Sequence, residues 1–397
     1  MIALFLLPVF ITIHTIIAIW LFKWLRHIHV VFRKRLVIGI IIAIYTYFIL
    51  DMYIAALIPH GKLERMMKLI GNYWLGFTIY AAMVVGIALL IRLILVKSRF
   101  KDSRFVKSKK VFILNGLLCI VIIGALCIGG HINATRLITT DYEVNIDKSG
   151  GEFADLDVVL VADLHMGYNI GVDMINQMVD RINDCDPDVV LIGGDIFDNS
   201  YESMDDPEGI MEAFKNIKSR YGVYAVWGNH DIAETIIGGF TFPSKNKKMS
   251  DIRMDQFLED AGIKLLRDES VIIEDSVYIF GRPDEERPGR GIDIRLTPAE
   301  LVSTMDTQKP VIVLEHEPKE LKELAKAGVD LHLSGHTHAG QTFPMNLTAK
   351  FSFENPYGLK MVDEMPSIVT SGVGLYGPYI RVGTKPEISN VHVHFVK

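Results

Sequence analysis

The chain has very little cysteine, with three residues in 397. Cys119 and Cys127 lie in one apolar run and Cys185 stands alone, so we expect no disulfide framework. Cysteine is also missing from every group of candidate ligands described below, which argues against a structural zinc site. Internal repeats and low-complexity segments are absent as well. These absences exclude a disulfide scaffold and a repeat protein.

Acidic residues are scarce in the first part of the chain. Residues 1–110 contain sixteen Lys and Arg but three Asp and Glu, a balance of +13, whereas residues 111–397 have a balance of −19. So large an asymmetry is typical of a basic part that meets a membrane or a nucleic acid. Because the basic residues separate long apolar runs, the pattern favours a membrane, and we expect no nucleic-acid partner.

Four apolar runs are long enough to cross a bilayer, which takes about 20 residues. They are Ile2–Phe22, Leu36–Ile58, Leu69–Ile91 and Val111–Gly130. The chain start has no Lys or Arg before the first run, which argues against a cleaved signal peptide. We therefore expect an all-α transmembrane region of four helices over residues 1–130, a linker over 131–150, and one α/β domain over 151–397.

The loops between these runs predict an orientation. The first and third loops carry twelve Lys and Arg together and the second carries three. Loops rich in Lys and Arg stay cytoplasmic. Both termini and the α/β domain are therefore expected on the extracytoplasmic side of the plasma membrane. An outward-facing domain without disulfides is more typical of a bacterial envelope than of a secreted eukaryotic module.

Carboxylates, amides and histidines follow five short apolar runs in the second half. The pairs of run and following motif are Val158–Val161 with Asp163 and His165, Val189–Ile192 with Asp195 and Asp198, Val223–Val226 with Asn229 and His230, Val311–Leu314 with His316, and Leu331–Leu333 with His336 and His338. Short apolar runs of this kind predict buried strands. Segments of helical spacing lie between them, which indicates a largely parallel sheet with its site at the strand ends. The tail lacks such helices, so we expect a second, partly antiparallel sheet packed on the first.

Oxygen and imidazole ligands without cysteine suit Mn, Fe or Zn, and we favour Mn. Seven candidate ligands are too many for one ion: Asp163, His165, Asp195, Asn229, His316, His336 and His338. Two divalent ions that share a carboxylate would use them. Two such ions with two aspartates and a hydroxide leave a net positive centre, which attracts a phosphate. The neutral Asn229 preserves that surplus. His332, inside an apolar run, is expected to be a core residue, and His131, His392 and His394 match no motif.

These motifs resemble the calcineurin-like metallophosphoesterase superfamily, whose signature runs D-x-H, G-D-x-x-D, G-N-H-[DE], H and G-H-x-H. All five blocks are present, over residues 158–338. The segments Gly335–Gln341 and Ile380–Ile388 are similar to the bacterial membrane-anchored phosphohydrolase branch. The resemblance implies a four-layer αββα sandwich with the metal ions at the strand ends.

The resemblance also implies a role for each site residue. One ion would be bound by Asp163, His165, Asp195 and His338, and the other by Asp195, Asn229, His316 and His336. His230 would be the general acid, with Asp198 orienting its ring. The implied reaction is attack of a metal-bridged hydroxide on a phosphoester or pyrophosphate bond.

The substrate is less well specified. Ser/Thr protein phosphatases of the superfamily have an arginine after the second aspartate of G-D-x-x-D, where this chain has Asn199. That departure argues against a protein phosphatase and leaves a phosphorylated small molecule, a lipid or an envelope polymer as substrate. Two segments could contact the substrate. The apolar stretch 236–242, followed by Lys245, Lys247 and Lys248, either dips into the lipid surface or caps the site. A second segment contains four cations that either bind an anionic substrate or form a solvated loop, namely Arg282, Arg287, Arg290 and Arg295.

Two other functions are compatible with the same residues. One is a non-catalytic receptor or assembly factor that binds phospholigands, which would not need the His230–Asp198 pair. The other is a transporter with an accessory domain, which four spans with few polar residues disfavour.

Overall fold

A computed structural model describes residues 2–232, 235–237, 240–242, 249–289, 292 and 294–396, with the backbone alone at 2–7, 52, 235–237 and 240–242. The chain divides into two compact units. The first comprises residues 1–132, 237–240 and 377–380, and the second comprises residues 133–236, 241–376 and 381–397.

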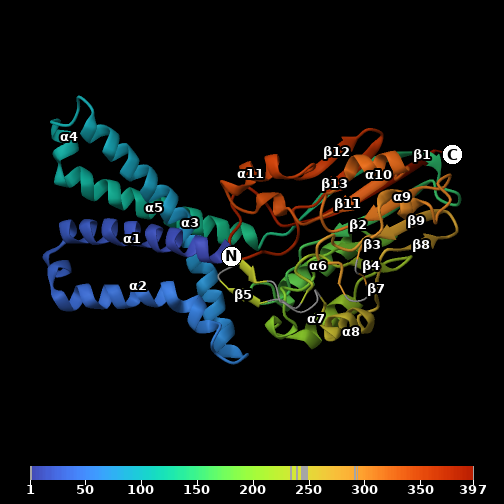
Figure 1. Ribbon diagram of the computed structural model, residues 1–397, viewed down its shortest axis with the longest axis horizontal. Coiled ribbons are helices and arrows are strands. Elements are labelled where there is room, and N and C mark those ends of the chain that lie inside the picture. The colour runs from blue at the N-terminus through green and yellow to red at the C-terminus, as the bar shows by residue number, and fades with distance from the viewer. Residues whose placement is uncertain are drawn as a thin grey trace. The chain divides into compact units, whose positions relative to one another are not determined.

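The first unit is helical (Figure 1). Its elements are α1 (Ile2–Ile28), η1 (Val30–Arg33), α2 (Arg35–Ala55), α3 (Lys62–Lys97), α4 (Arg104–Lys107) and α5 (Lys109–Ala134). Three described helical segments are long and apolar enough to span a membrane, namely Pro8–Ile28, Lys62–Lys97 and Lys109–Ala134. The expected helices are thus present, and because α2 is not among these three segments, spanning by the expected run Leu36–Ile58 stays a prediction.

The second unit contains two six-stranded sheets. The first has the order β1-β14-β2-β3-β4-β7 and the second has the order β12-β13-β11-β10-β9-β8. The strands of the first sheet are β1 (Ile138–Ser149), β2 (Asp155–Val161), β3 (Val189–Gly193), β4 (Val223–Val226), β7 (Ile263–Leu265) and β14 (Glu387–Val396). Those of the second are β8 (Glu269–Ile273), β9 (Val277–Gly281), β10 (Val311–Leu314), β11 (Leu331–Ser334), β12 (Gly358–Val362) and β13 (Met365–Val369).

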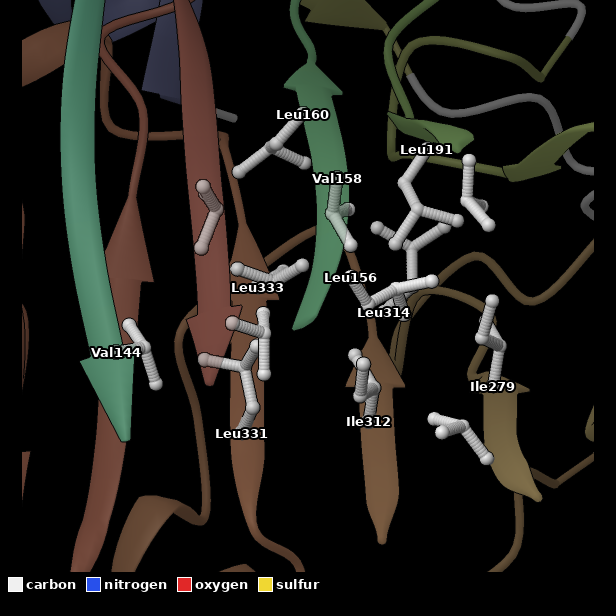
Figure 2. Close-up of a cluster of buried hydrophobic side chains, with 14 of the residues drawn as sticks. Val144, Leu156, Val158, Leu160, Leu191, Ile279, Ile312, Leu314, Leu331 and Leu333 are labelled. Carbon is white, nitrogen blue, oxygen red and sulfur yellow. The ribbon is translucent and has the colours of Figure 1, made fainter. Parts of the chain in front are cut away.

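The two sheets pack face to face through one apolar core (Figure 2). Successive side chains of a strand point to opposite faces, so Ile312 and Leu314 of β10 enter this core. Val311 and Val313 point the other way, into a second cluster with Leu301 and Leu324. Those last two residues belong to the helices α9 (Pro298–Val302) and α10 (Leu321–Ala327), which form the outer layer on the second sheet.

The outer helices on the other side follow their predicted patterns. The helix α6 (Val172–Asp184) buries its apolar stripe, including Ile175, Met178 and Ile182, and contacts α7 (Pro207–Lys215). Asp206 caps α7, since its side chain accepts a hydrogen bond from Gly209 N at 2.9 Å. The remaining elements are η2 (Tyr201–Ser203), α8 (Ile252–Asp260), η3 (His338–Gly340) and α11 (Met345–Ser352). The arrangement is the expected αββα sandwich.

The stretch 131–150, expected as a linker, contains the end of α5 and all of β1. Strand β1 pairs in parallel with β14, and β14 pairs antiparallel with β2. The tail strand β14 therefore belongs to the first sheet, while β13 belongs to the second. This pairing joins segments about 250 residues apart, so no local pattern in the sequence announces it.

Two short strands, β5 (Thr235–Ile237) and β6 (Phe240–Phe242), pair with each other. Their side chains, together with Lys245, Lys247 and Lys248, lie outside the described residues, as does Arg290. The membrane-dipping or capping role expected of this stretch therefore stays a prediction.

Candidate metal centre

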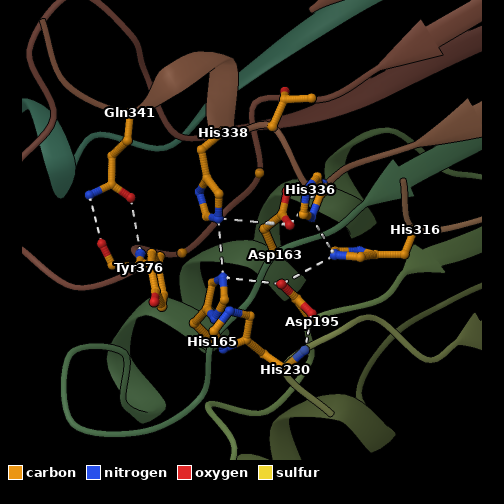
Figure 3. Close-up of polar contacts among 12 residues, drawn as sticks. Asp163, His165, Asp195, His230, His316, His336, His338, Gln341 and Tyr376 are labelled. Atoms are coloured by element: carbon orange, nitrogen blue, oxygen red, sulfur yellow. Dashed lines mark hydrogen bonds and ion pairs between the residues drawn. The ribbon is translucent and has the colours of Figure 1, made fainter. Parts of the chain in front are cut away.

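The candidate ligands come from both sheets. Asp163 and His165 follow β2, Asp195 follows β3, and Asn229 follows β4. His316 follows β10 and His336 and His338 follow β11 in the second sheet. Because β2, β3 and β4 are parallel neighbours, as are β10 and β11, each set leaves its sheet at the same edge. The structure brings all seven residues together. Figure 3 shows the two aspartates and the four histidines among them.

The backbone turns sharply at these positions. Asp163, His165, Asp195, His336 and His338 all have a positive φ, between 46° and 71°. This left-handed conformation costs residues other than glycine about 1–3 kcal/mol each, and such residues gather at functional sites. The turn points each side chain back across the strand ends. Backbone strain at these five residues thus accompanies the convergence of their side chains.

Glycines in the motifs make room for the carboxylates. A Cβ added at Gly228 would collide with the Oδ1 of Asp195, and one added at Gly335 would come within 2.8 Å of the Oδ2 of Asp163. The glycines before Asn229 and His336 are therefore required by the close approach of these two aspartates.

Two groups of ligand atoms form around Asp195. The Oδ2 of Asp195 lies 3.6 Å from the Nε2 of His165 and 3.2 Å from the Nε2 of His316. On one side, His165 Nε2 lies 3.1 Å from His338 Nε2, and His338 Nε2 lies 3.8 Å from Asp163 Oδ1. On the other side, the Oδ1 of Asn229 lies 3.0 Å from both His316 Nε2 and His336 Nδ1. Asp195 thus lies between the two groups.

The proton positions suit a cation. The Nδ1 of His316 lies 2.9 Å from the carbonyl oxygen of Gly193, which can only accept, so Nδ1 carries a proton. Burial lowers the pKa of His316, but the charge of Asp195, 3.2 Å from its Nε2, raises this pKa well above its usual value, so without a metal ion Nε2 carries a proton as well. The Nε2 of His336 lies 3.3 Å from a carboxylate oxygen of Glu317, which leaves the lone pair of its Nδ1 3.2 Å from the Nε2 of His316. A divalent ion between the two rings would take the place of the proton on His316 and accept the lone pairs of both nitrogens. The donor set therefore fits divalent metal ions.

Burial and charge shift the pKa values of these groups. Burial alone would raise the pKa of Asp195, but the charges of His316, His230 and His165 and the hydrogen bond with His316 together outweigh it and hold this pKa well below its usual value. Burial, with Asp195 nearby, raises the pKa of Asp163 to about 6. Burial also lowers the pKa of His230 and of His336 to about 4.

His230 lies beside the group that contains His165. Its ring centroid is 5.0 Å from that of His165, and its backbone N–H donates to the Oδ1 of Asp195 at 2.7 Å. The Asp198 carboxylate, expected to orient this ring, has its Oδ1 3.9 Å from the Nδ1 of His230 and 3.8 Å from that of His165.

Asn199 makes the direct contact with the His230 ring, through its Oδ1 and the ring Nδ1. Its backbone N–H donates to the carbonyl oxygen of His230, and its Nδ2 donates to that of Ile232, both at 2.9 Å. The left-handed conformation of Asn199, with φ of 58°, turns its side chain back toward this loop. Asn199 occupies the position where protein phosphatases of the superfamily have an arginine, and here that side chain is used to hold His230.

Two further residues near His230 were not predicted as site residues, namely Tyr376 and Gln341, which hydrogen-bonds the Tyr376 backbone. The Tyr376 ring lies 4.7 Å from that of His230 and 5.8 Å from that of His165. Gln341 bonds the Tyr376 backbone twice, with its Nε2 donating to the carbonyl oxygen and its Oε1 accepting from N–H, both at 3.0 Å. The Gln341 position was visible in the motif at residues 335–341, but no motif contains Tyr376.

Two further positions differ from their expected surroundings. Arg282 and Arg295 are buried, and both donate to Glu315 and Glu320. They therefore form neither a solvated loop nor an anion-binding surface, because the negative charge of Glu315, which is fully buried, holds them inside. His332 is a core residue as predicted, with its Nε2 3.0 Å from Glu315 Oε1.

Comparison with known proteins agrees with this geometry. Residues 156–340 match the model of the family described as calcineurin-like phosphoesterase. The chain is 30% identical over 286 residues to a "Transmembrane protein with metallophosphoesterase domain" of Danio rerio, covering 69% of this chain and 62% of that protein. It is 28% identical over 261 residues to an "Uncharacterized metallophosphoesterase" of Aquifex aeolicus, covering 65% of this chain and 92% of that protein.

The chain spans about three fifths of the length of the first relatives it matches. Among solved structures, a dimetal phosphatase from Danio rerio is 13% identical with a TM-score of 0.35, covering 55% of this chain and 88% of that one. So slight a likeness does not bear on function.

Metal binding at this centre should weaken as the pH falls, and more steeply below about pH 6. In the metal-free site Asp163 takes up a proton as the pH falls through about 6, because burial raises its pKa, and that proton competes with the ion. His336, with its pKa lowered to about 4, adds no proton in this range. One additional proton steepens the fall by about tenfold per pH unit.

Competition with a chelator for Mn²⁺, measured from pH 7.5 to 5, checks this. Asp163→Asn cannot take up this proton and should lack the steeper part of the curve. A constant slope in the natural protein would contradict the prediction.

Proposed function

With residues 156–340 forming a calcineurin-like phosphoesterase domain, the chain belongs to that superfamily, and we propose that it is a membrane-anchored, two-metal phosphoesterase. The observation that carries the proposal is the position of Asp195, whose Oδ2 lies between His165 and His316. A single carboxylate there can serve two ions at once. The scissile bond would be a phosphoester or a pyrophosphate.

The two proposed ions would divide the ligands in the way that the family pattern implies. Asp163, His165, Asp195 and His338 would hold one ion, and Asp195, Asn229, His316 and His336 the other. Two divalent ions, when bound, lower the pKa of water and neutralise charge on the phosphoryl group. Asp163 is held in place for this role, since both its oxygens accept from the backbone N–H of His336. Mn²⁺ is our favoured ion for this mixed oxygen and imidazole set.

His230 would donate a proton to the leaving oxygen. Its Nδ1 contacts the Oδ1 of Asn199, an acceptor, so the ring is fixed with a proton at Nδ1 and its Nε2 available for transfer. An anionic phosphoryl group beside the ring favours the protonated imidazole. A receptor that only binds phospholigands would not need such a proton donor.

Substrate contacts are expected at Tyr376 rather than at Arg282 or Arg295. Arg282 and Arg295 are engaged inside the domain, and the position that would clamp a phosphate in protein phosphatases is Asn199. Tyr376 lies against the ring of His230, the proposed proton donor, with the two ring centroids 4.7 Å apart. A phosphorylated lipid, small molecule or envelope polymer would fit, with the aromatic ring as a wall for the leaving group.

Asp195→Ala should lower activity by several orders of magnitude, because it removes a ligand from both ions. His338→Ala affects one group only, so excess Mn²⁺ should restore part of its activity. His394→Ala, an exposed histidine outside the site, is the matched control and should retain full activity. Hydrolysis of an aryl phosphate together with elemental analysis measures both effects. Full activity of Asp195→Ala, with fewer than two ions per chain in the natural protein, would refute the proposal.

His230→Asn should keep both metal ions and lose about 10²–10⁴-fold activity on alkyl phosphoesters. The loss on nitrophenyl esters should be much smaller, since a nitrophenolate leaves without a proton. Asn199→Ala should show the same selective loss more mildly, and Asn199→Asp, which keeps an acceptor oxygen, should restore most of the activity. Steady-state rates with both ester classes measure this. An equal loss on both classes by His230→Asn would recast His230 as a phosphate-binding residue.

The catalytic domain should lie on the extracytoplasmic side. The cations of the loops at residues 23–35 and 97–110 outnumber those of the loop at 62–68, which predicts that the first two are cytoplasmic. Protease added to spheroplasts should therefore cleave within residues 140–397 and spare Lys97–Lys110, as mapped by mass spectrometry of the fragments. Protection of the domain until the membrane is permeabilised would reverse the orientation and leave the chemistry unaffected.

A further inference from the structure

A cavity of about 660 Å³ lies within the helical unit, at one end of its long helices. Its walls come from the last turns of α1 and α3, the segment around α4, and the first turn of α5. Helix α5 runs from Lys109 to Ala134, so the cavity lies at the helix end opposite the one from which the chain continues into β1.

The lining has two chemically different parts. Five cations border it, namely Lys23, Arg92, Lys101, Lys107 and Lys109. Apolar side chains, among them Ile16, Trp20 and Leu89, line the rest. Ile16 is two turns before Lys23 on α1, which corresponds to about 10 Å along the helix. The cavity therefore changes from basic to apolar along the direction in which a phospholipid changes from headgroup to acyl chain.

The positive charge is largely uncompensated. The one acidic residue between Glu64 and Asp141 is Asp102, and it pairs with Lys107 at 2.7 Å. Among the described residues, no carboxylate lies within ion-pair distance of Lys23, Arg92, Lys101 or Lys109. Arg92 instead lies over the ring of Phe112, 5.1 Å from its centroid. The five cations are exposed to solvent, and a cluster of this kind attracts an anion. Basic pockets between membrane helices take anionic lipid headgroups.

We propose that this cavity binds one anionic phospholipid, with the phosphate among the lysines and Arg92 and an acyl chain along Ile16, Trp20 and Leu89. The apolar half of the lining favours a lipid over a soluble phosphate, which would leave that half empty. This site is separate from the metal centre and does not depend on the proposed catalysis.

Quenching of Trp20 fluorescence tests the proposal in the full-length chain. The protein is placed in phosphatidylcholine nanodiscs that contain a small fraction of phosphatidylglycerol or phosphatidylcholine with brominated acyl chains. Bromine quenches indole emission only near contact, and the part of the signal that W20F lacks reports the cavity. We expect brominated phosphatidylglycerol to quench Trp20 at a far lower mole fraction than brominated phosphatidylcholine.

The triple variant K23Q/R92Q/K109Q should reduce this preference by on the order of a hundredfold, because each cation contributes to anionic-lipid affinity. R33Q/K34Q/R35Q removes the same charge from residues that do not line the cavity, and should keep the preference. Equal elution profiles and helical content confirm that both variants are folded.

Three outcomes would overturn the proposal. These are equal quenching by the two brominated lipids, an equal loss of preference in both triple variants, and displacement of the brominated phosphatidylglycerol by excess soluble sn-glycerol 3-phosphate. The last outcome would assign the cavity to a soluble phosphate.

Discussion

Two aspartates, Asp163 and Asp195, lie almost wholly out of reach of solvent at the meeting point of two sheets. Buried carboxylates are costly unless positive charge or hydrogen-bond donors surround them. Here four histidines and the backbone N–H groups of His230 and His336 converge on them, and the charges of nearby histidines, chiefly His316, hold the pKa of Asp195 well below its usual value. The lone pair of His336 Nδ1 faces the Nε2 of His316 at 3.2 Å, where a divalent ion would replace the proton of His316. Divalent ions would complete this compensation, and the family pattern of the motifs follows from that requirement.

The groups that compensate the two buried aspartates come together because both sheets end at the same place. The core between the sheets fixes where β2, β3, β10 and β11 stop, and the left-handed residues that follow turn the ligands inward. Asp231 links two of these loops, accepting from Phe197 N at 2.8 Å and Gly228 N at 2.7 Å, and burial raises its pKa to about 8. Arg381, also buried, donates to the carbonyl oxygens of Ser371 and Gly374 and so holds the loop before Tyr376. A rigid frame of this kind keeps the ligand atoms in position before any ion arrives.

The sequence was sufficient for the parts of the site that are encoded locally. Each ligand directly follows a strand, so the five motifs predicted which residues meet, and the helical spacing predicted α6 and α7. Contacts between distant segments were not predictable. The pairing of β1 with β14, the burial of Arg282 and Arg295 against Glu315, and the approach of Tyr376 to His230 each depend on the assembled sheets. The contact of Asn199 with His230 was not predicted for another reason. The neighbouring Asp198 matched the family motif, whereas the left-handed turn at Asn199 brings its amide oxygen to the His230 ring.

The shared position of Asp195 is the claim on which the proposed chemistry depends, and anomalous X-ray scattering at the manganese edge tests it directly. Crystals of the full-length protein grown with Mn²⁺ should show two peaks about 3.5–4 Å apart, with one oxygen ligand from Asp195 between them. One peak should be surrounded by Asp163, His165 and His338, and the other by Asn229, His316 and His336. A single peak at saturating Mn²⁺, or two peaks that do not share Asp195, would contradict the two-metal centre.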